Sequence, residues 1–405
     1  MEISPLREKY TVELHLADLE GDPYPILKKL RTDQPVAWLP GMGLWLVTRW
    51  DEVMTVNTQP DLFTAETTPS FLGDALGPNM LALEGPPAQR LKEAMLPPFL
   101  TKGSAGWYVA ERMVAVADEL IDQMAAEDGC DLMSAYAAPF STISLQVVLG
   151  LDQVPWQKMW AWCQGVCAGI VNWEGDPDLT ALADQAKAAL SEVILEKIDQ
   201  VKRQPDHSAI SHMVHLKNDR LTEDEIINNV RLMISGGINE PRDGIGLAAH
   251  ALFSHPQLKQ QVLADERLWP KLVNEVFRFY SPVGTSTRQT TGPVTLAGVA
   301  LPAGELIAAV LTSANRDEAH WSQPERFDIH RREGQNLAFA IGQHKCLGAW
   351  LGFQEVLVGT KRLFERLPHL RPQSDEPVEI SGFEFRGPKH LAVVWDPQRK
   401  GNYSA

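Results

Sequence analysis

The chain has 405 residues, of which 44% are hydrophobic and 22% charged, and its formal net charge is −15. This acidic excess disfavours nucleic acid and anionic membranes as partners, and no stretch approaches the roughly 18 uninterrupted apolar residues of a membrane span. Residues 1–23 lack the hydrophobic core of a signal peptide, so a cytoplasmic location is expected. The four cysteines are too few for a disulfide framework. Cys163 and Cys167, four apart in an apolar stretch, are interpreted as core residues and not as metal ligands.

Hydrophobic periodicity and turn signals predict a mainly helical chain with short strands. Residues 36–38 and 43–48 are predicted strands separated by the turn signal Pro40-Gly41. Apolar residues recur at spacings of three and four in four predicted helices, residues 112–124, 143–149, 179–201 and 223–253. Beyond Pro282, residues 294–296 and 306–311 are predicted strands of a second small sheet. Because no repeat, low-complexity tract or Gly/Ser-rich linker marks a boundary, residues 1–405 are expected to form a single domain.

A single cysteine lies in a glycine-containing loop directly before a predicted helix. Cys346 stands between Gly342 and Gly348, and the helix is expected to run from residue 349 towards residue 358. Unpaired N–H groups and the positive dipole end at a helix N-terminus lower the pKa of a thiol and stabilise a thiolate ligand. Both glycines allow the backbone to approach a flat cofactor closely. From these residues alone, Cys346 is either such a ligand or a buried small hydrophobe.

Three sequence motifs, which follow one another along the chain in the order that the family has, resemble those of the cytochromes P450. The haem-binding signature of that family is matched by Phe339, Gly342, His344, Cys346 and Gly348. Ala340 departs from the pattern, because the family usually has glycine there. Glu275 and Arg278 resemble the Glu-x-x-Arg of the K helix, and Arg326 resembles the arginine that completes its buried ion-pair network. The resemblance implies a haem-thiolate monooxygenase whose fold is mainly α with two small β-sheets.

The resemblance also implies which residues bind haem b, the iron protoporphyrin IX of the family. Cys346 is the expected iron ligand. The other expected cofactor-binding residues are His344, Arg288, Lys92, Phe339 and Gly342. His344 and Arg288 match positions that bind the haem propionates, and Lys92 stands where arginine is usual. Ala88 stands where histidine or glutamine is usual, which leaves Gln89 and Arg90 as alternative anchors.

The expected distal helix contains Asn239-Glu240-Pro241 and departs from the family. Most members have an acid followed by an alcohol, the pair that relays protons; here Asn239 replaces the acid and Glu240 the alcohol. A partly buried carboxyl has a raised pKa and can pass a proton, so Glu240 and Asn239 are the expected catalytic residues. Alternatively, Glu240 pairs with a structural arginine such as Arg242 and does no chemistry. Pro241 cannot donate to the carbonyl of Gly237, which predicts a kink with a free acceptor.

The Asn-Glu-Pro variant is similar to the distal helix of P450s that O-demethylate small methoxyphenols such as guaiacol and syringol. O-demethylation of a methoxyarene is therefore the expected reaction, and hydroxylation of a terpene-like or other small hydrophobic molecule is the alternative. Alignment with the family gives an apolar set of substrate-binding candidates with an aromatic wall: Leu232, Gly236, Gly284, Phe385 and Phe71. Each of them is equally compatible with ordinary core packing.

The chain lacks a motif for a flavin or nicotinamide cofactor, because no Gly-x-Gly-x-x-Gly opens a helix after a strand. The resemblance therefore implies that electrons come from a separate ferredoxin or iron–sulfur flavoprotein reductase, with dioxygen as co-substrate. Lys345, Arg331 and Arg332 are either a basic docking patch for that partner or ordinary solvated charges. Two rival functions are a peroxygenase, in which Glu240 assists peroxide cleavage, and a haem-binding sensor that does not turn over.

Overall fold

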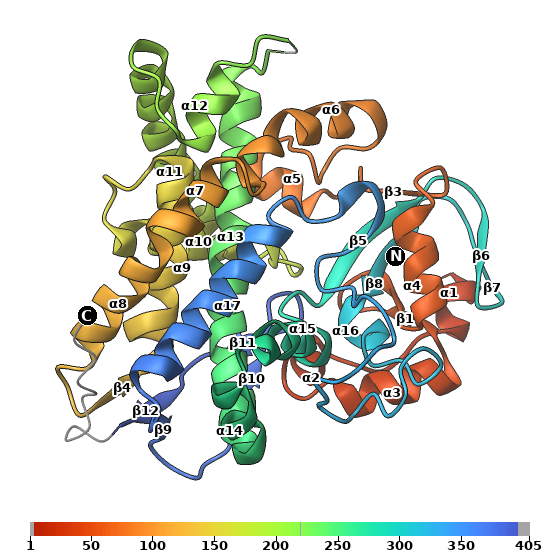
Figure 1. The fold of residues 1–405 in the computed structure, drawn as a ribbon. Helices are drawn as coiled ribbons and strands as arrows, with labels where there is room; N and C mark the ends of the chain where they lie inside the picture. The colour runs from red at the N-terminus through yellow and green to blue at the C-terminus, as the bar shows by residue number, and fades with distance from the viewer. Residues whose placement is uncertain (1–3, 219, 396–405) are drawn as a thin grey trace.

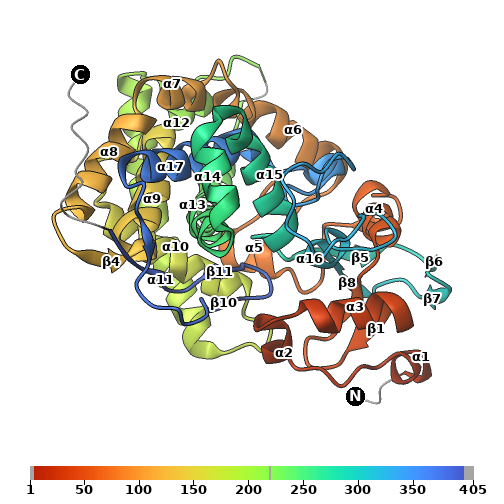
Figure 2. The same cartoon turned by 60° about the horizontal axis from the view of Figure 1, so that its bottom comes forward.

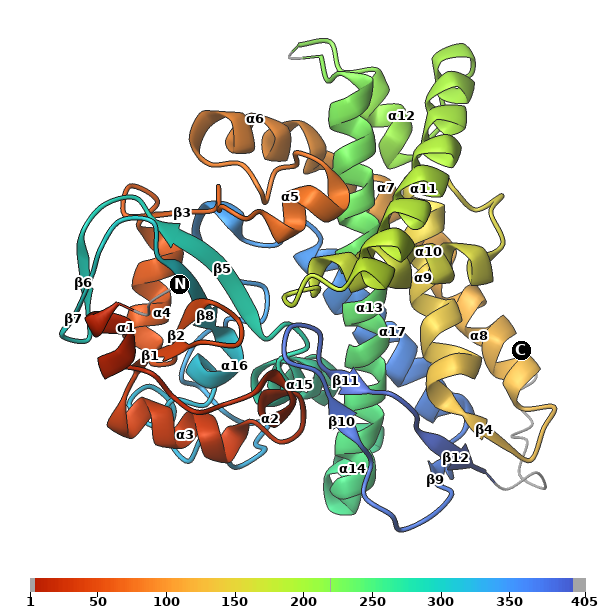
Figure 3. The ribbon, with the colours of Figure 1, turned by 180° about the vertical axis from the view of Figure 1, so that it is seen from behind.

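The computed structural model describes residues 4–218 and 220–395, which are organised around one long helix. This helix, α13 (Glu223–Ser254), runs through the middle of the molecule (Figures 1 and 3). It begins at Thr222, whose hydroxyl accepts the N–H of Glu225 while the Glu225 carboxylate accepts the N–H of Thr222. Most of its length is buried on all sides, as expected of a helix in the core of a large protein. The helix continues through Pro241.

The helices around α13 form most of the molecule. Those packed directly against it include α9 (Ala138–Leu149), α10 (Trp156–Ile170), α11 (Pro177–Arg203), α15 (Trp269–Tyr280) and α17 (Ala349–Arg366). The remaining α-helices are α1 (Pro5–Lys9), α2 (Leu16–Glu20), α3 (Tyr24–Asp33), α4 (Trp50–Thr58), α5 (Phe71–Leu76), α6 (Gly85–Met95), α7 (Ser104–Glu111), α8 (Met113–Met124), α12 (Ala209–Val214), α14 (Pro256–Ala264) and α16 (Leu311–Ala314). Short helical turns cover Pro97–Phe99, Met133–Ala137, Glu266–Leu268 and Gly342–His344.

The largest sheet has five strands in the order β1-β2-β8-β5-β3. Its strands are β1 (Val36–Leu39), β2 (Leu44–Val47), β8 (Leu306–Val310), β5 (Thr285–Thr290) and β3 (Phe63–Thr64). A three-stranded sheet contains β4 (Gly129–Asp131), β12 (Ala392–Val394) and β9 (Arg371–Pro372), and two hairpins are β6 (Val294–Leu296) with β7 (Val299–Leu301) and β10 (Ile380–Ser381) with β11 (Gly387–Pro388). Figure 2 shows the five-stranded sheet and α1 to α4 on one side of the molecule, with α7 to α12 on the other.

The predicted fold class and the predicted helices are confirmed, but one sheet assignment is wrong. Residues 112–124, 143–149, 179–201 and 223–253 fall in α8, α9, α11 and α13. The strands expected to form a second sheet separate instead: residues 294–296 form a hairpin, while β8 runs parallel to β2 with Ile307 opposite Trp45. A parallel pair joins segments that are distant along the chain, and local periodicity carries no information about such pairing. Across the described ranges, no helix is long and apolar enough to cross a membrane.

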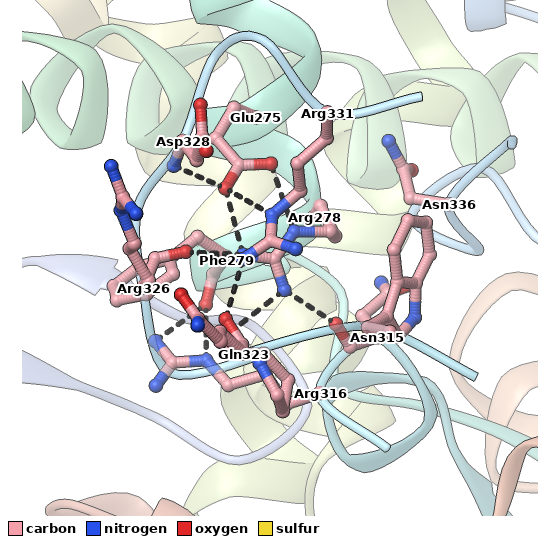
Figure 4. Close-up of polar contacts among 12 residues, drawn as sticks. Glu275, Arg278, Phe279, Asn315, Arg316, Gln323, Arg326, Asp328, Arg331 and Asn336 are labelled. Atoms are coloured by element: carbon pink, nitrogen blue, oxygen red, sulfur yellow. Dashed lines mark hydrogen bonds and ion pairs between the residues drawn. The ribbon is translucent and has the colours of Figure 1, made fainter. Parts of the chain in front are cut away.

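A buried ion-pair network fixes the loop that follows α16 against α15 (Figure 4). The guanidinium of Arg278 binds both carboxylate oxygens of Glu275 at 2.7 and 2.8 Å, and both side chains are almost inaccessible. The third member is Arg331, whose Nε donates to Glu275 at 3.1 Å. The prediction that Arg326 completes the network is wrong, because Arg326 is exposed and contributes only its main-chain carbonyl, which accepts from Arg278 and Arg331.

Candidate active site

A large cavity lies between α13 and the loop before α17. It encloses about 2090 Å³ of space, a figure that includes its opening to solvent. Its wall combines α5, α6, α13, β5, the loop of residues 338–348 and the turn between β10 and β11.

Cys346 faces this cavity from the loop before α17. Its N–H donates to the carbonyl of Phe339 at 3.0 Å, which holds the loop closed, and its side chain is accessible from within the cavity. Removal from bulk water raises the pKa of the Cys346 thiol to about 11, opposed by the N–H of Gly348 and by the charge of Lys92. The helix terminus expected to lower this pKa therefore contributes less than burial does. A metal ion at the thiol would supply the charge that keeps it deprotonated.

Two backbone positions in this loop have a positive φ, but they serve different contacts. Gly342 has φ +76°, and a Cβ there would lie 2.4 Å from the carbonyl oxygen of Asn57. Gly342 therefore permits close packing on α4 and is not part of the described cavity wall, and its contact with the cofactor stays a prediction. Ala340, at φ 52°, lines the cavity in a conformation that favours glycine, which explains why the family usually has glycine there. Phe339 also lines the cavity, as expected.

Three basic side chains gather at one end of the cavity, where two carboxylates would fit. Arg288 on β5 is 6% exposed, and within the described residues it donates to the carbonyl of Thr287 at 2.7 Å and to Asn57 Oδ1 at 3.5 Å, both neutral. Burial lowers the pKa of Arg288 to about 10. Lys92 on α6 donates to two main-chain carbonyls at 2.6 Å each, and burial lowers its pKa. Buried cations that have neutral partners are suited to binding an anionic group.

His344 completes this basic end. Its Nε2 lies 3.2 Å from both carboxylate oxygens of Glu84, while burial and then the charge of Arg288 lower the pKa of its imidazole. Together with Arg288 and Lys92, it fits the propionates of a haem whose iron is bound by Cys346. Neither alternative anchor lines the described cavity: Gln89 is exposed and bonds Glu93, and Arg90 forms an ion pair with Glu225 at 2.8 Å.

Glu240 on α13 reaches the cavity from the side opposite to the loop of residues 338–348. Within the described residues, its Oε2 is buried without a hydrogen-bond partner. Burial, followed by the nearby Cys167 and Asp243, raises the pKa of Glu240 well above its usual value. Arg242, the expected structural partner, instead binds Asp243 at 2.6 Å. The carboxyl of Glu240 therefore lies in the cavity wall with one enclosed oxygen that has no described partner, and its raised pKa favours the protonated form.

Asn239 does not belong to the described cavity wall. Its Oδ1 accepts from Gln164 at 2.7 Å, and its Nδ2 donates to Cys167 Sγ at 3.1 Å, so the side chain faces α10. Successive side chains of a helix are turned about 100° apart, so Asn239 and Glu240 face different sides, and the expected role of Asn239 in proton transfer stays a prediction. Cys163 and Cys167 are buried core residues, as expected, and no group of three or more His, Cys, Asp or Glu suited to a metal occurs in the part of the chain that the structure describes.

Four of the five substrate-binding candidates line the cavity: Leu232, Gly236, Phe385 and Phe71. Gly284 does not, because a Cβ there would lie 1.7 Å from the carbonyl oxygen of Phe383; its small size serves the packing of two chain segments. Sequence reasoning missed Trp173, which stands 4.7 Å from Phe71 between ring centres, and Glu384. Trp173 lies in a loop without a pattern, whereas Glu384 directly precedes Phe385 and could have been considered with it.

Comparisons with known proteins agree with this geometry. The family model for cytochrome P450 matches residues 176–388. "Cytochrome P450 monooxygenase PikC" of Streptomyces venezuelae is 30% identical over 93% of this chain and 92% of its own length. The chain belongs to the cytochrome P450 family. This P450 is also 28% identical to "Steroid C26-monooxygenase" of Mycolicibacterium smegmatis, over 91% of each chain. The solved structure of CYP109Q5 from Chondromyces apiculatus has the same fold, with a TM-score of 0.86 and 24% identity over 95% of this chain and 98% of that one.

Membership of the family establishes the general activity. This P450 is a monooxygenase, an oxidoreductase that uses haem b, dioxygen and electrons from a redox partner. The alternative function, a haem-binding sensor that does not turn over, is therefore wrong. Arg331 lies in the Glu275 network with only 10% of its side chain exposed, so it cannot serve in a docking patch. Lys345 and Arg332 are exposed, and their docking role stays a prediction.

Proposed function

We propose that this P450 O-demethylates a small methoxyarene, with Cys346 as the iron ligand. The observation that carries the proposal is a cavity in which an unpaired carboxyl, Glu240, faces a wall of aromatic and aliphatic side chains. Phe71, Trp173 and Phe385 provide ring faces and edges that suit a flat substrate. A small residue, Gly236, leaves space beside the helix for a ring substituent.

The side chains of this chain would divide the work as follows. The haem, when bound, supplies the activation of dioxygen with two electrons from a partner protein. Cys346 holds its iron, while Arg288, Lys92 and His344 hold its propionates. The apolar wall orients the ether methyl group and excludes water. Insertion of one oxygen atom into a methyl C–H bond gives a hemiacetal, which collapses to a phenol and formaldehyde; the second oxygen atom leaves as water with the two electrons and two protons.

We further propose that Glu240 delivers these protons. Because burial raises the pKa of Glu240 well above its usual value, its carboxyl can hold a proton to donate and must then be reprotonated. Gln164 is exposed on α10 and bonds Asn239, which directly precedes Glu240 in the helix. These polar side chains are candidates for a route from the surface, with Asn239 as a positioning residue and not as a contact of the substrate.

The test of Glu240 is the number of electrons consumed per formaldehyde released. Glu240→Gln preserves the shape but removes the proton donor, and a lost general acid costs about 10²–10⁴-fold in proton-transfer rate. We expect formaldehyde per NADH to fall at least several-fold, while the substrate dissociation constant changes little. Glu355→Gln is the comparison variant, because Glu355 on α17 is another acid of the cavity wall and also has a buried oxygen without a described partner. Normal coupling in Glu240→Gln would exclude the proton-delivery role.

The substrate class is tested by screening methoxyphenols, methoxybenzoates and terpenes for a low-spin to high-spin Soret shift, followed by a formaldehyde assay. A shift and formaldehyde with a methoxyphenol support O-demethylation. A shift with terpenes alone would favour hydroxylation of an apolar molecule. The same Glu240 carboxyl favours one second function, peroxygenase activity, because an acid beside the iron site can assist peroxide cleavage. Equal rates with hydrogen peroxide and with a ferredoxin or iron–sulfur flavoprotein reductase would support it.

A further inference from the structure

The turn between β10 and β11 places a second carboxyl in the cavity wall. Figure 3 shows this hairpin beside α13. The turn is attached to the strand that carries Arg288: the N–H of Gly284 donates to the carbonyl of Glu384 at 2.9 Å, and Val283 pairs with Phe385. Because main-chain contacts hold both Glu384 and the next residue, Phe385, the side chain of Glu384 has a defined position in the wall.

Only one of the two carboxyl oxygens of Glu384 has a hydrogen-bond donor among the described residues. Its Oε2 accepts a short hydrogen bond from the hydroxyl of Thr285. In the described ranges, Oε1 has no protein donor, and it is not among the fully enclosed atoms, so it opens to the cavity. Burial raises the pKa of Glu384 to about 7, opposed by Thr285. At neutral pH, the carboxyl therefore offers an acceptor oxygen whether it is protonated or ionised.

The charges in the cavity wall are separated into two ends. The basic residues of the wall are Lys92, Arg288, His344 and Lys345, all in or beside the loop that would hold the propionates. The acids of the wall are Glu240, Glu384 and Glu355, of which Glu355 is on α17, the helix that follows the Cys346 loop. Glu240 and Glu384 form the substrate end and are close enough that Glu384 contributes to the raised pKa of Glu240. The described wall has no cation at this end. A substrate carboxylate would meet two acids and no partner, whereas an O–H or N–H group would find an acceptor.

We propose that Glu384 forms a substrate subsite that recognises a hydrogen-bond donor on the aromatic ring, a phenolic O–H or an amine N–H, and rejects carboxylates. Thr285 is a positioning residue that holds the carboxyl with Oε1 towards the cavity. This proposal rests on the proposed function in one respect, that the substrate is aromatic. The recognition of a hydrogen-bond donor by Glu384 does not depend on a methoxy group.

The experiment compares probes in which a hydroxyl is replaced by a methyl group of similar size. The pairs are guaiacol with 2-methylanisole, and 4-ethylphenol with 4-ethyltoluene, which lacks any methoxy group; aniline analogues form the amine arm. Dissociation constants are measured from the Soret shift of the ferric holoenzyme. The wild type is expected to prefer the hydroxyl in both pairs by about tenfold or more, the range of one hydrogen bond to a charged group.

Three variants test the assignment to Glu384. Glu384→Met keeps the length of the side chain without an acceptor, and should lose the preference. Thr285→Val should weaken the preference without changing the size of the wall, and serves if Glu384→Met does not fold. Glu384→Gln removes the negative charge and should improve the binding of 2-methoxybenzoate. Glu379→Met is the matched control, because Glu379 is exposed beside the same hairpin.

The outcomes separate the subsite from the proposed function. An unchanged ratio in Glu384→Met and Thr285→Val overturns the subsite, even if guaiacol releases formaldehyde. A Glu384-dependent preference for 4-ethylphenol without formaldehyde from any methoxyarene supports the subsite and overturns O-demethylation. If the wild type binds none of these probes, both fail.

Discussion

Replacement of Arg331 by alanine tests the corrected ion-pair network. The substitution removes one bond to Glu275 and the donors to the carbonyls of Ser322, Gln323 and Arg326. Glu275 would not be left unpaired, because two bonds from Arg278 and the N–H of Asp328 at 2.8 Å remain. The cost should therefore lie at the lower end of the roughly 3–5 kcal/mol for breaking a buried ion pair, about 3 kcal/mol.

This cost converts to a measurable change in the melting temperature of the holoenzyme. An unfolding entropy of about 2.1 cal/mol/K per residue gives roughly 0.85 kcal/mol/K for the whole chain, so about 3 kcal/mol lowers Tm by about 3–4 °C. Thermal unfolding is followed by far-UV circular dichroism at equal haem content. Arg331→Lys should give an intermediate loss, because lysine keeps the charge but lacks the planar fork.

Arg326→Ala is the matched control for this experiment. The side chain of Arg326 is exposed, and only its main-chain carbonyl takes part in the described network, so the substitution should change stability by less than about 0.5 kcal/mol, or under 1 °C. A loss from Arg326→Ala as large as that from Arg331→Ala would refute the assignment. A Tm of Arg331→Ala within 1 °C of the wild type would refute the estimate of its contribution.

Three further predictions concern the cavity loop and its acids. Gly342→Ala should introduce at least about 2 kcal/mol of strain and so lower both Tm and haem content, because a Cβ at φ +76° would lie 2.4 Å from the carbonyl oxygen of Asn57. Gly292→Ala should be neutral in the same assays, because Gly292 has open space around it. Ala340→Gly should raise stability by up to about 1 kcal/mol, since relief of the positive φ exceeds the entropy cost of glycine; a lower Tm would contradict this. The folded protein binds the Glu384 proton more tightly than the unfolded chain does, because the pKa of Glu384 is raised to about 7 in the folded state. The free energy of unfolding should therefore fall as pH rises through about 7. The binding of a phenol should tighten over the same pH range. Glu240 faces the same cavity with its own raised pKa, so both effects are taken as differences between the wild type and Glu384→Gln, and equal pH profiles would contradict the prediction.

Much of the fold and one end of the site could be predicted from local sequence. Helices with a clear apolar period, such as α8 and α11, follow from residue spacing, because each side chain's direction depends only on its place in the helix. The loop around Cys346 is equally local: a closed turn before a helix sets the position of the thiol, and the resemblance to the P450 family followed from it. Glu240 could be placed over the same cavity because it belongs to one continuous helix.

The tertiary structure decided which distant groups meet. Arg326 and Arg331 are five residues apart, and only the path of the loop through the Glu275 site brings Arg331 there and leaves Arg326 exposed. Gly342 and Gly284 are small because backbones from other segments press on them, which no local pattern reveals. Glu384 became a candidate only when the β10–β11 turn was found on the strand of Arg288, so that its carboxyl shares a cavity with Glu240. The sequence motifs carried the resemblance that implies haem-thiolate chemistry, and long-range packing decided which side chains surround the cysteine.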